Sequence, residues 1–388
     1  MIDPRNTISE PQRSSMELAK PFDVFVIATV DTLGYLCGIP MYDLYRDPDA
    51  CITAFTEGRD RLESLIGDDV PLIVPYTTPV IKYGHLNTLG IPLIFPKTGQ
   101  VALDMQPMGL AKAVALLESV QGDDTFSSEL TKRQKQFLAI MRKRFAGKRV
   151  HWGWQWEGPL TTLWALSGME SMYAVYDDPD LFKHCMHLVT RSIVEYTKFY
   201  CTVDGGDVLD PFPDHGRLCD DIAAMYAPHM WPEMVLPFWE EFYRAPIPAR
   251  KLHCEDMKPA HLPYLASLGI TDFDPGISPK LNPAIIGAHE WLPFCWRLGS
   301  FHYQDMSMRS IEDFIFSAAS CGASYVFTVM EPIMCNEETI AKVRQLHASG
   351  REVERQISGG ASRADLEKSV MGGDASGYWE RWNGYRKV

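Results

Sequence analysis

Two residues that can bind metal ions, His253 and Glu255, lie two positions apart at the end of an apolar run. In a strand, residues at i and i+2 share a face, so both side chains can point to one side while Cys254 points to the other. The opposite register, with Cys254 inside, stays open. Imidazole and carboxylate together suit zinc, so we predict a zinc site. Its expected ligands are His253, Glu255, His302 and Glu331, with Cys254, Cys295 and Cys335 in reserve.

Other polar and aromatic residues follow further apolar runs of the sequence. Asp220 and Asp221 are adjacent carboxylates that could act as acid and base without a metal. Asp31 and Tyr76 follow the first two runs, and we expect them to bind substrate. For any single residue the alternative is structural, because a histidine at a strand end often makes only a hydrogen bond and a carboxylate only a salt bridge.

Three tryptophans alternate in the segment HWGWQWEG, at positions Trp152, Trp154 and Trp156. On a strand they would face the same side. If that side points inward, the indoles line a pocket and could stack on an aromatic ring or enclose a cationic methyl donor. If it points outward, they pack beneath surrounding helices. Both interpretations stay open, and we include the three tryptophans in the expected substrate-binding set.

Short apolar runs alternate with helical patterns along the chain, and this alternation predicts a parallel sheet. Eight runs are the number that closes into a (β/α)8 TIM barrel, whose active site lies at the carboxyl ends of the strands. An open doubly wound sheet is the rival, but no G-x-G-x-x-G or G-x-x-x-x-G-K-[ST] motif follows a run. The predicted strands are 23–30, 71–76, 149–156, 206–211, 249–254, 270–275, 296–302 and 324–332.

The predicted domain organisation is one α/β barrel with additions. Residues 1–21 are polar and are expected to form an N-terminal arm, 22–350 the catalytic barrel, and 351–388 a C-terminal tail rich in aromatic residues. We expect the tail to pack on the barrel or on a partner subunit, which allows a homodimer. Residues 77–148 are expected to be an insertion that contains a basic amphipathic helix at 131–148.

Composition narrows the classes of partner and compartment. The 388-residue chain has a formal net charge of −13 and a pI of about 5.3, which disfavours nucleic acid and anionic membranes. Apolar stretches are too short to span a bilayer. The nine cysteines show no paired spacing and no signal segment is evident, so the sequence predicts a cytoplasmic protein with reduced thiols.

Four segments, in the same order, resemble the uroporphyrinogen decarboxylase-like superfamily. HCEDMKPAHLPYLASLGITDFDPG resembles its H-x-C-G segment with the helix and G-[VIF]-D strand that follow. EGPLTTLWALSGMESMYAVYDDPDLF is similar to its G-P-[FL]-T and D-x-P-[ED] helices, and CDDIAAMYAPHMWPEMVLPFWEEFY to its D-D-[LI]-G segment. WRLGSF with SIEDFIFSAASCGASYVFT resembles the closing pattern, so the likeness covers residues 22–348.

The resemblance is greater to the zinc-dependent, corrinoid-linked methyltransferases than to the decarboxylases. The arginine segment with which the decarboxylases bind propionates is replaced by VFVIATVDTLGYLCG. Relatives that use methylcobamide bind zinc through H-x-C and a later cysteine, whereas this chain has Glu255 and Glu331 at the matching positions. Oxygen ligands make a harder site, which favours activation of an oxygen-bound methyl group over activation of a thiol.

The resemblance implies a zinc-dependent methyltransferase that moves a methyl group from a methoxylated, aromatic substrate to a Co(I) corrinoid. The chain has no D-x-H-x-x-G corrinoid segment, because PDHGRL at 213–218 lacks that spacing, so a separate corrinoid protein is the expected partner. Three alternatives stay open. They are methyl transfer from methylcorrinoid to a thiol or folate, a metal-free decarboxylase or lyase using Asp220 and Asp221, and a non-catalytic protein that binds a corrinoid or an aromatic compound.

Overall fold

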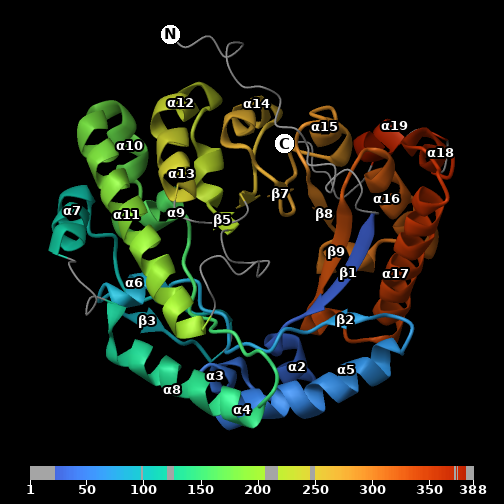
Figure 1. Ribbon diagram of the computed structural model, residues 1–388, viewed down its shortest axis with the longest axis horizontal. Helices are drawn as coiled ribbons and strands as arrows, with labels where there is room; N and C mark the ends of the chain where they lie inside the picture. Colours follow the sequence, from blue (N-terminus) through green and yellow to red (C-terminus); the bar gives the residue numbers. More distant parts are fainter. Residues whose placement is uncertain are drawn as a thin grey trace.

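The structure is a computed structural model with a mixed α/β architecture, in which parallel strands alternate with helices. Most helices lie on the outside of the molecule and most strands lie nearer its middle (Figure 1). The structure describes residues 22–97, 99–119, 126–205, 217–244, 250–370, 373 and 375–381. The predicted N-terminal arm therefore lies outside the described residues.

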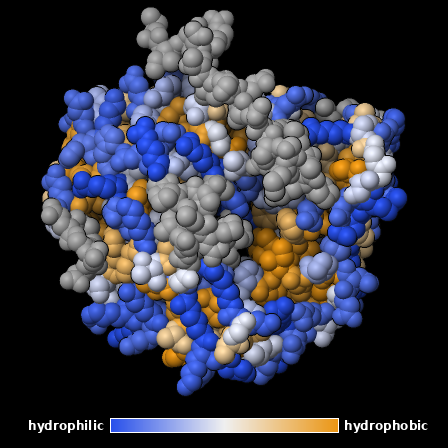
Figure 2. Space-filling view, viewed as in Figure 1, coloured by the Kyte–Doolittle hydropathy of each residue, from blue (hydrophilic) through white to orange (hydrophobic). Residues whose placement is uncertain are grey.

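The strands belong to two parallel sheets and one short antiparallel pair. They are β1 (Asp23–Ala28), β2 (Leu72–Ile73), β3 (Leu93–Ile94), β4 (Ala102–Leu103), β5 (Arg217–Cys219), β6 (Lys251–His253), β7 (Asp272–Asp274), β8 (Cys295–Arg297) and β9 (Tyr325–Met330). One parallel sheet has the order β2-β1-β9-β8 and the other β5-β6-β7, whereas β3 and β4 pair antiparallel within the predicted insertion. Hydrophobic side chains gather over β1 and β2 in the view of Figure 2.

Isolated contacts connect the two parallel sheets. Parallel bridges join Thr77 to His151, Ile81 to Trp154 and Phe273 to Phe294. The first two link the segment after β2 to residues 151–154, and the third links β7 to the start of β8. The backbone N–H of Gly158 donates to the carbonyl oxygen of Cys219 at 2.6 Å, which brings the 151–158 segment to the end of β5.

The helices begin and end at residues suited to these positions. Asp178 accepts a hydrogen bond from Leu181 N at the start of α11, and Gly205 ends this helix with a left-handed φ of 74°. The helices longer than six residues are α2 (Val30–Leu36), α5 (Arg59–Ile66), α7 (Leu110–Ser119), α8 (Glu129–Arg144), α9 (Pro159–Ser167), α10 (Glu170–Asp177), α11 (Pro179–Asp204), α13 (Leu236–Tyr243), α16 (Met308–Ser320), α17 (Glu337–Ser358) and α19 (Ala375–Arg381).

Shorter helices complete these connections. They are α3 (Met41–Leu44), α4 (Pro48–Thr53), α6 (Gly84–Thr88), α12 (Trp231–Met234), α14 (Leu262–Leu265), α15 (Pro283–Gly287) and α18 (Arg363–Glu367). A π-helical turn at Ala54–Gly58 joins α4 to α5, and 3-10 turns include Asp221–Met225, Ser300–Gln304 and Pro332–Met334. The last three follow β5, β8 and β9, so they lie at the carboxyl ends of these strands.

Side chains alternate between the two sides of each strand, as the pleat requires. Leu218 and Leu252 point to the helices and are fully buried. Arg217 and His253 lie on the opposite, inner side, where they share the carboxylate of Asp274. On β5, β6 and β7, the outer side therefore belongs to the hydrophobic core and the inner side carries charge.

Most predicted strands are present, with two differences. β1, β2, β6, β7, β8 and β9 lie within or overlap six of the predicted runs. The run at 206–211 lies outside the described residues, and β3, β4 and β5 were not predicted. Residues 149–156 form only isolated bridges, because tyrosine hydroxyls of α11 bind their carbonyl groups: Tyr200 donates to Trp152 O and Tyr196 to Trp154 O.

The predicted boundary between the barrel and the C-terminal tail falls within a helix. Residue 350 lies inside α17, which continues to Ser358, so the tail begins later than predicted. The described part of the tail packs on the fold, because Trp379 of α19 is fully buried and contacts the indole of Trp296 on β8. Among the described residues, no helix is both long enough and apolar enough to cross a membrane.

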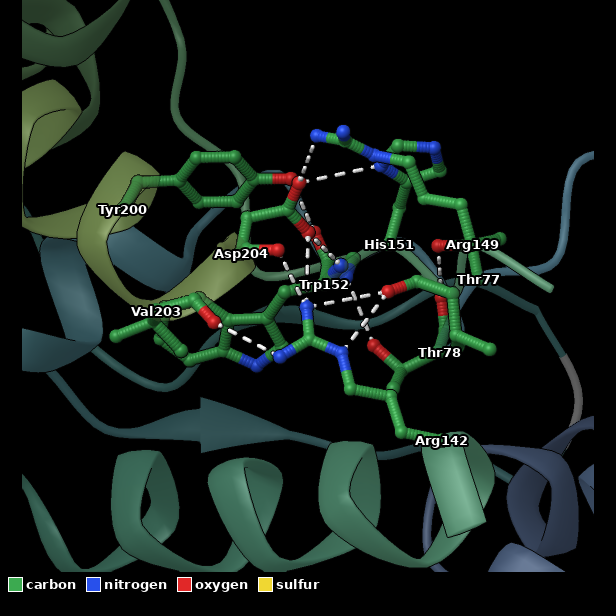
Figure 3. A network of polar contacts seen from close by, with 11 residues as sticks. Thr77, Thr78, Arg142, Arg149, His151, Trp152, Tyr200, Val203 and Asp204 are labelled. Atoms are coloured by element: carbon green, nitrogen blue, oxygen red, sulfur yellow. Dashed lines mark hydrogen bonds and ion pairs between the residues drawn. The ribbon is translucent and has the colours of Figure 1, made fainter. Parts of the chain in front are cut away.

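A buried carboxylate, Asp204, attaches the end of α11 to the 149–152 segment (Figure 3). One oxygen accepts a hydrogen bond from Trp152 N at 2.6 Å, and the other lies 3.1 Å from His151 Nδ1 and 3.4 Å from Arg149. Arg142 of α8 completes the network by donating to backbone carbonyls of this segment and of α11. Side chains thus add to the backbone hydrogen bonds that join this segment to residues 76–85.

We predict that Asp204→Ala destabilises the protein by about 3 to 5 kcal/mol, because it leaves buried donors and charges without their shared acceptor. The free energy of unfolding by denaturant measures the change. Glu195→Gln is the control, since Glu195 is an exposed carboxylate on the same helix with a Lys198 partner, and its loss should cost under about 1 kcal/mol. Equal effects of the two substitutions would contradict the role given to Asp204.

Candidate functional site

The last residue of β6, His253, is the centre of a polar cluster at the carboxyl ends of the strands. Its Nδ1 lies 3.0 Å from Asp274 Oδ2 at the end of β7. Its Nε2 faces two further carboxylates, at 3.7 Å from Asp221 Oδ1 and 3.9 Å from Glu255 Oε1. Burial alone would lower the pKa of His253, but the hydrogen bond and charge of Asp274 raise it above its ordinary value.

The loop after β6 holds Glu255 beside this imidazole. Glu255 N donates to Asp221 Oδ1 at 2.8 Å, and Glu255 Oε1 accepts a hydrogen bond from Ile277 N at 3.4 Å. Gly276 has a φ of +61°, and a Cβ built there would lie 2.2 Å from Glu255 Oε1. The glutamate side chain thus occupies the space that only glycine leaves open at position 276. Asp256, the next residue after Glu255, adopts the left-handed region with φ 60°.

A chain of polar contacts leads from Tyr325 through Asp272 and Arg217 to Asp274. Arg217 of β5 donates to Asp274 Oδ2 at 2.9 Å and lies 3.7 Å from Asp272 Oδ2. Tyr325 of β9 donates its hydroxyl proton to Asp272 at 3.0 Å. Burial would raise the pKa of Asp274, yet His253 and Arg217 hold it well below its usual range. Ion pairs and a hydrogen bond therefore link the side chains on the inner side of β5, β7 and β9.

A second pair, Lys82 and Glu157, lies near the cluster. Lys82 Nζ is 3.7 Å from Glu157 Oε1, and the Glu157 side chain is only 13% exposed. Burial raises the pKa of Glu157 to about 7, against the opposing effect of Lys82. Cys219 pairs in register with His253 between β5 and β6, so its side chain lies on the inner side as well.

Comparison with known proteins gives one kind of match. No protein-family model matches the chain, and no curated protein matches it by sequence. Among solved structures, a methyltransferase from Methanosarcina mazei superposes with a TM-score of 0.58 at 14% identity, over 86% of this chain and 95% of that chain. The two proteins share a fold. At this identity the likeness extends to the mixed α/β architecture with parallel sheets and to nothing finer.

The four predicted zinc ligands fall into two groups. His253 and Glu255 face each other at 3.9 Å. Glu331, at the end of β9, instead accepts from Ser300 at 2.7 Å and lies 3.6 Å from Arg297. His302 Nδ1 accepts a hydrogen bond from Gly299 N at 3.2 Å, and burial together with Arg297 lowers the pKa of His302 to about 4.

β7 lies between the two groups in the order of the parallel strands, because the first group follows β6 and the second follows β8 and β9. Among the described residues, no three His, Cys, Asp or Glu side chains already stand in the arrangement of a metal site. His253, Asp221 and Glu255 come nearest to one, because their facing atoms lie within 3.9 Å of the imidazole. The reserve thiol Cys254 points away from them and contacts Asp220 O at 3.3 Å.

The three tryptophans share one face, and that face is turned to α11. Trp152 and Trp154 are fully buried, and Trp152 stacks on Tyr200 with ring centroids 5.7 Å apart. Trp156 contacts Tyr196 and Tyr200 edge to face. These positions match the packing interpretation of the alternating tryptophans and give no support to a pocket lined by three indoles.

The side chains of Asp220, Asp31 and Tyr76 make their contacts outside the His253 cluster, although Asp220 N donates to His253 O at 3.1 Å. Asp220 is fully buried, and its carboxylate accepts from Leu160 N, Thr161 N and Trp239 Nε1, so it anchors α9 and α13. Asp31 is in the first turn of α2, where burial raises its pKa. Tyr76 packs on Phe55 and Phe145, and its hydroxyl accepts from Arg59 at 3.3 Å.

Several residues of the cluster were not chosen from the sequence. They are Lys82, Glu157, Arg217, Cys219 and Asp274. The alternation D-F-D at 272–274 was the available signal for Asp274, because it places two carboxylates on one face of a strand. Lys82 and Arg217 lie in segments where no strand was predicted, so nothing in the sequence directed them toward His253.

We predict that Gly276→Ala destabilises the protein more than Gly269→Ala does. Both glycines have a φ of +61°, but nothing lies within 4 Å of a Cβ at position 269, so that change carries only the backbone strain of about 1 to 2 kcal/mol. At position 276 the methyl group must also displace Glu255. Chemical denaturation measures both free energies of unfolding.

A double-mutant cycle assigns the excess to Glu255. In a Glu255→Ala background the space beside position 276 is empty, so Gly276→Ala should cost no more than Gly269→Ala. If the excess persists without the glutamate side chain, the contact between these two positions is not its cause.

Proposed function

We propose that the chain is a methyltransferase whose parallel strands close into a (β/α)8 barrel, with the His253 cluster at the carboxyl ends of the strands. The shared fold with a Methanosarcina mazei methyltransferase supports this proposal. So do the bridges and hydrogen bonds that connect residues 151–158 to their neighbours on both sides, since they give every parallel segment two neighbours. Active sites of such barrels lie at that end.

We further propose that the cluster holds a zinc ion. His253 Nε2, Glu255 and Asp221 would be its ligands, because an imidazole nitrogen and two carboxylate oxygens already face one another there. Asp221 and Glu255 are nearly half exposed, so their carboxylates are able to turn toward an ion. When bound, the zinc supplies a Lewis acid for an oxygen atom of the substrate. In this proposal His302 and Glu331 are not ligands.

The proposed reaction moves a methyl group from a methoxylated, aromatic substrate to the Co(I) corrinoid of a separate protein. The methyl carbon–oxygen bond breaks, the methyl group passes to cobalt, and the oxygen leaves with the electron pair as a phenolate. Glu157, with a pKa of about 7 through burial, is suited to give this oxygen a proton at neutral pH. Lys82, 3.7 Å from Glu157, favours the return of the carboxylate form afterwards.

The position of Asp220 bears on the alternatives. A metal-free lyase that used Asp220 and Asp221 as acid and base would need both carboxylates at the substrate. Asp220 is enclosed and its oxygens are taken by three donors, which supports a structural role for it. Transfer from methylcorrinoid to a thiol or folate, and binding without turnover, remain outcomes of the experiment below.

We predict that the purified protein contains zinc and demethylates methoxylated aromatic compounds when a reduced corrinoid protein is supplied. His253→Ala and Glu255→Gln should each lower zinc affinity by more than about 100-fold, which exceeds the usual effect of losing a ligand's hydrogen-bond partner. His302→Gln is the control and should keep the metal. Elemental analysis and the corrinoid absorbance spectrum measure the two properties.

Each contrary result assigns another function. Full activity after chelation would support the lyase, and methylation of a thiol or folate by methylcorrinoid would support the reverse transfer. Binding of the corrinoid or the aromatic compound with no methyl transfer would support a binding protein. Zinc retained in both His253→Ala and Glu255→Gln would refute the ligand assignment.

A further inference from the structure

The carboxylate of Asp274 meets hydrogen-bond donors on both of its oxygens. Oδ2 accepts a hydrogen bond from Arg217 at 2.9 Å and lies 3.0 Å from His253 Nδ1. Oδ1 accepts a hydrogen bond from Gly276 N at 2.9 Å. A guanidinium and a backbone amide can only donate. Asp274 is therefore held as an acceptor, and a neutral His253 must carry its proton on Nδ1 to complete the arrangement.

We infer that Asp274 is a positioning residue, which fixes the tautomer and ring orientation of His253 so that the Nε2 lone pair faces Asp221 and Glu255. The imidazole can then offer Nε2 to a metal ion, because the second nitrogen of a histidine ligand is usually held by such a partner. The part of this inference that concerns metal binding rests on the proposed function. The part that concerns the tautomer does not.

Arg217 ties the arrangement to the strands. It lies on β5 and reaches Asp272 and Asp274 on β7, so two parallel strands hold the carboxylate that orients a histidine on the strand between them. The Arg217 side chain is 21% exposed and that of Asp274 only 6%, so water competes little for these contacts. The direction of Nε2 is thus set mainly by contacts between the strands, together with the hydrogen bond from Gly276 N.

Asp272 provides a matched control within the same network. It lies two residues from Asp274 on the same side of β7, also pairs with Arg217, and accepts from Tyr325. No contact of Asp272 reaches His253 among the described residues. If Asp274 served only to neutralise Arg217, substitution of either aspartate would affect the site in the same way.

The first test is zinc titration of the wild type, Asp274→Asn and Asp272→Asn. An asparagine at 274 has one oxygen and one NH2 group, so its NH2 must face a donor, either Gly276 N–H or Arg217 with His253. In both orientations the contact that orients His253 weakens. We expect Asp274→Asn to weaken zinc binding by about 10- to 100-fold and Asp272→Asn to leave it nearly unchanged. Equal losses in the two variants, or none in Asp274→Asn, would overturn the inference.

The second test needs no metal. Side-chain nitrogen NMR of the zinc-free protein, at a pH where imidazole is neutral, reports which ring nitrogen carries the proton. We expect His253 in the wild type and in Asp272→Asn to carry it on Nδ1, and Asp274→Asn to show a mixture of tautomers. A proton on Nε2 in the wild type would overturn the inference.

The two tests also separate this inference from the proposed function. A wild-type protein that binds no zinc would contradict the proposed metal site, and the NMR spectrum would still decide whether Asp274 orients His253. Thermal unfolding of each variant identifies any general loss of structure, since a folding defect would broaden many histidine signals rather than change the tautomer of one.

Discussion

The inner side of β5 and β7 buries charge, and this is tolerable only because each charged group has a partner. Arg217, Asp272 and Asp274 lie where a water-soluble protein ordinarily places aliphatic residues. An unpaired ion there would cost several kcal/mol, so the guanidinium, the two carboxylates and the hydroxyl of Tyr325 must occupy fixed positions together. Of these groups, Asp274 is the one that contacts His253. The polar cluster at the strand ends is joined to these paired charges through that contact.

On the outer side of the strands, the buried side chains are apolar. Leu218 and Leu252 point to the helices and are fully buried, and Trp296 packs against Trp379 of the C-terminal region. Apolar packing on the outer face supplies the favourable free energy of folding, while the inner face is free to be polar. This division explains how a sheet can carry a dense set of ionisable groups and still have a large hydrophobic core.

Alternation was enough to predict most parallel strands, since a period of two is a local property of the sequence. It does not account for the position of Glu255, which lies in the loop after β6. It could not say which face of the tryptophan segment is turned to α11, because that depends on Tyr196 and Tyr200, far along the chain. The same limit applies to Glu331, whose Arg297 and Ser300 partners come from another strand end. Asp221 is a ligand candidate only because the β5 and β6 ends lie side by side.

Residues 151–154 are held by isolated parallel bridges and by hydrogen bonds from side chains, not by a continuous ladder of strand pairing. A segment held in this way lacks the cooperativity of a continuous ladder, in which the loss of one hydrogen bond weakens the next. Its local opening would be governed by Asp204 and by the tyrosines of a single long helix, whereas continuous backbone pairing holds β1, β8 and β9 together. Flexibility next to Glu157 would then be a property that α11 sets from outside the strands.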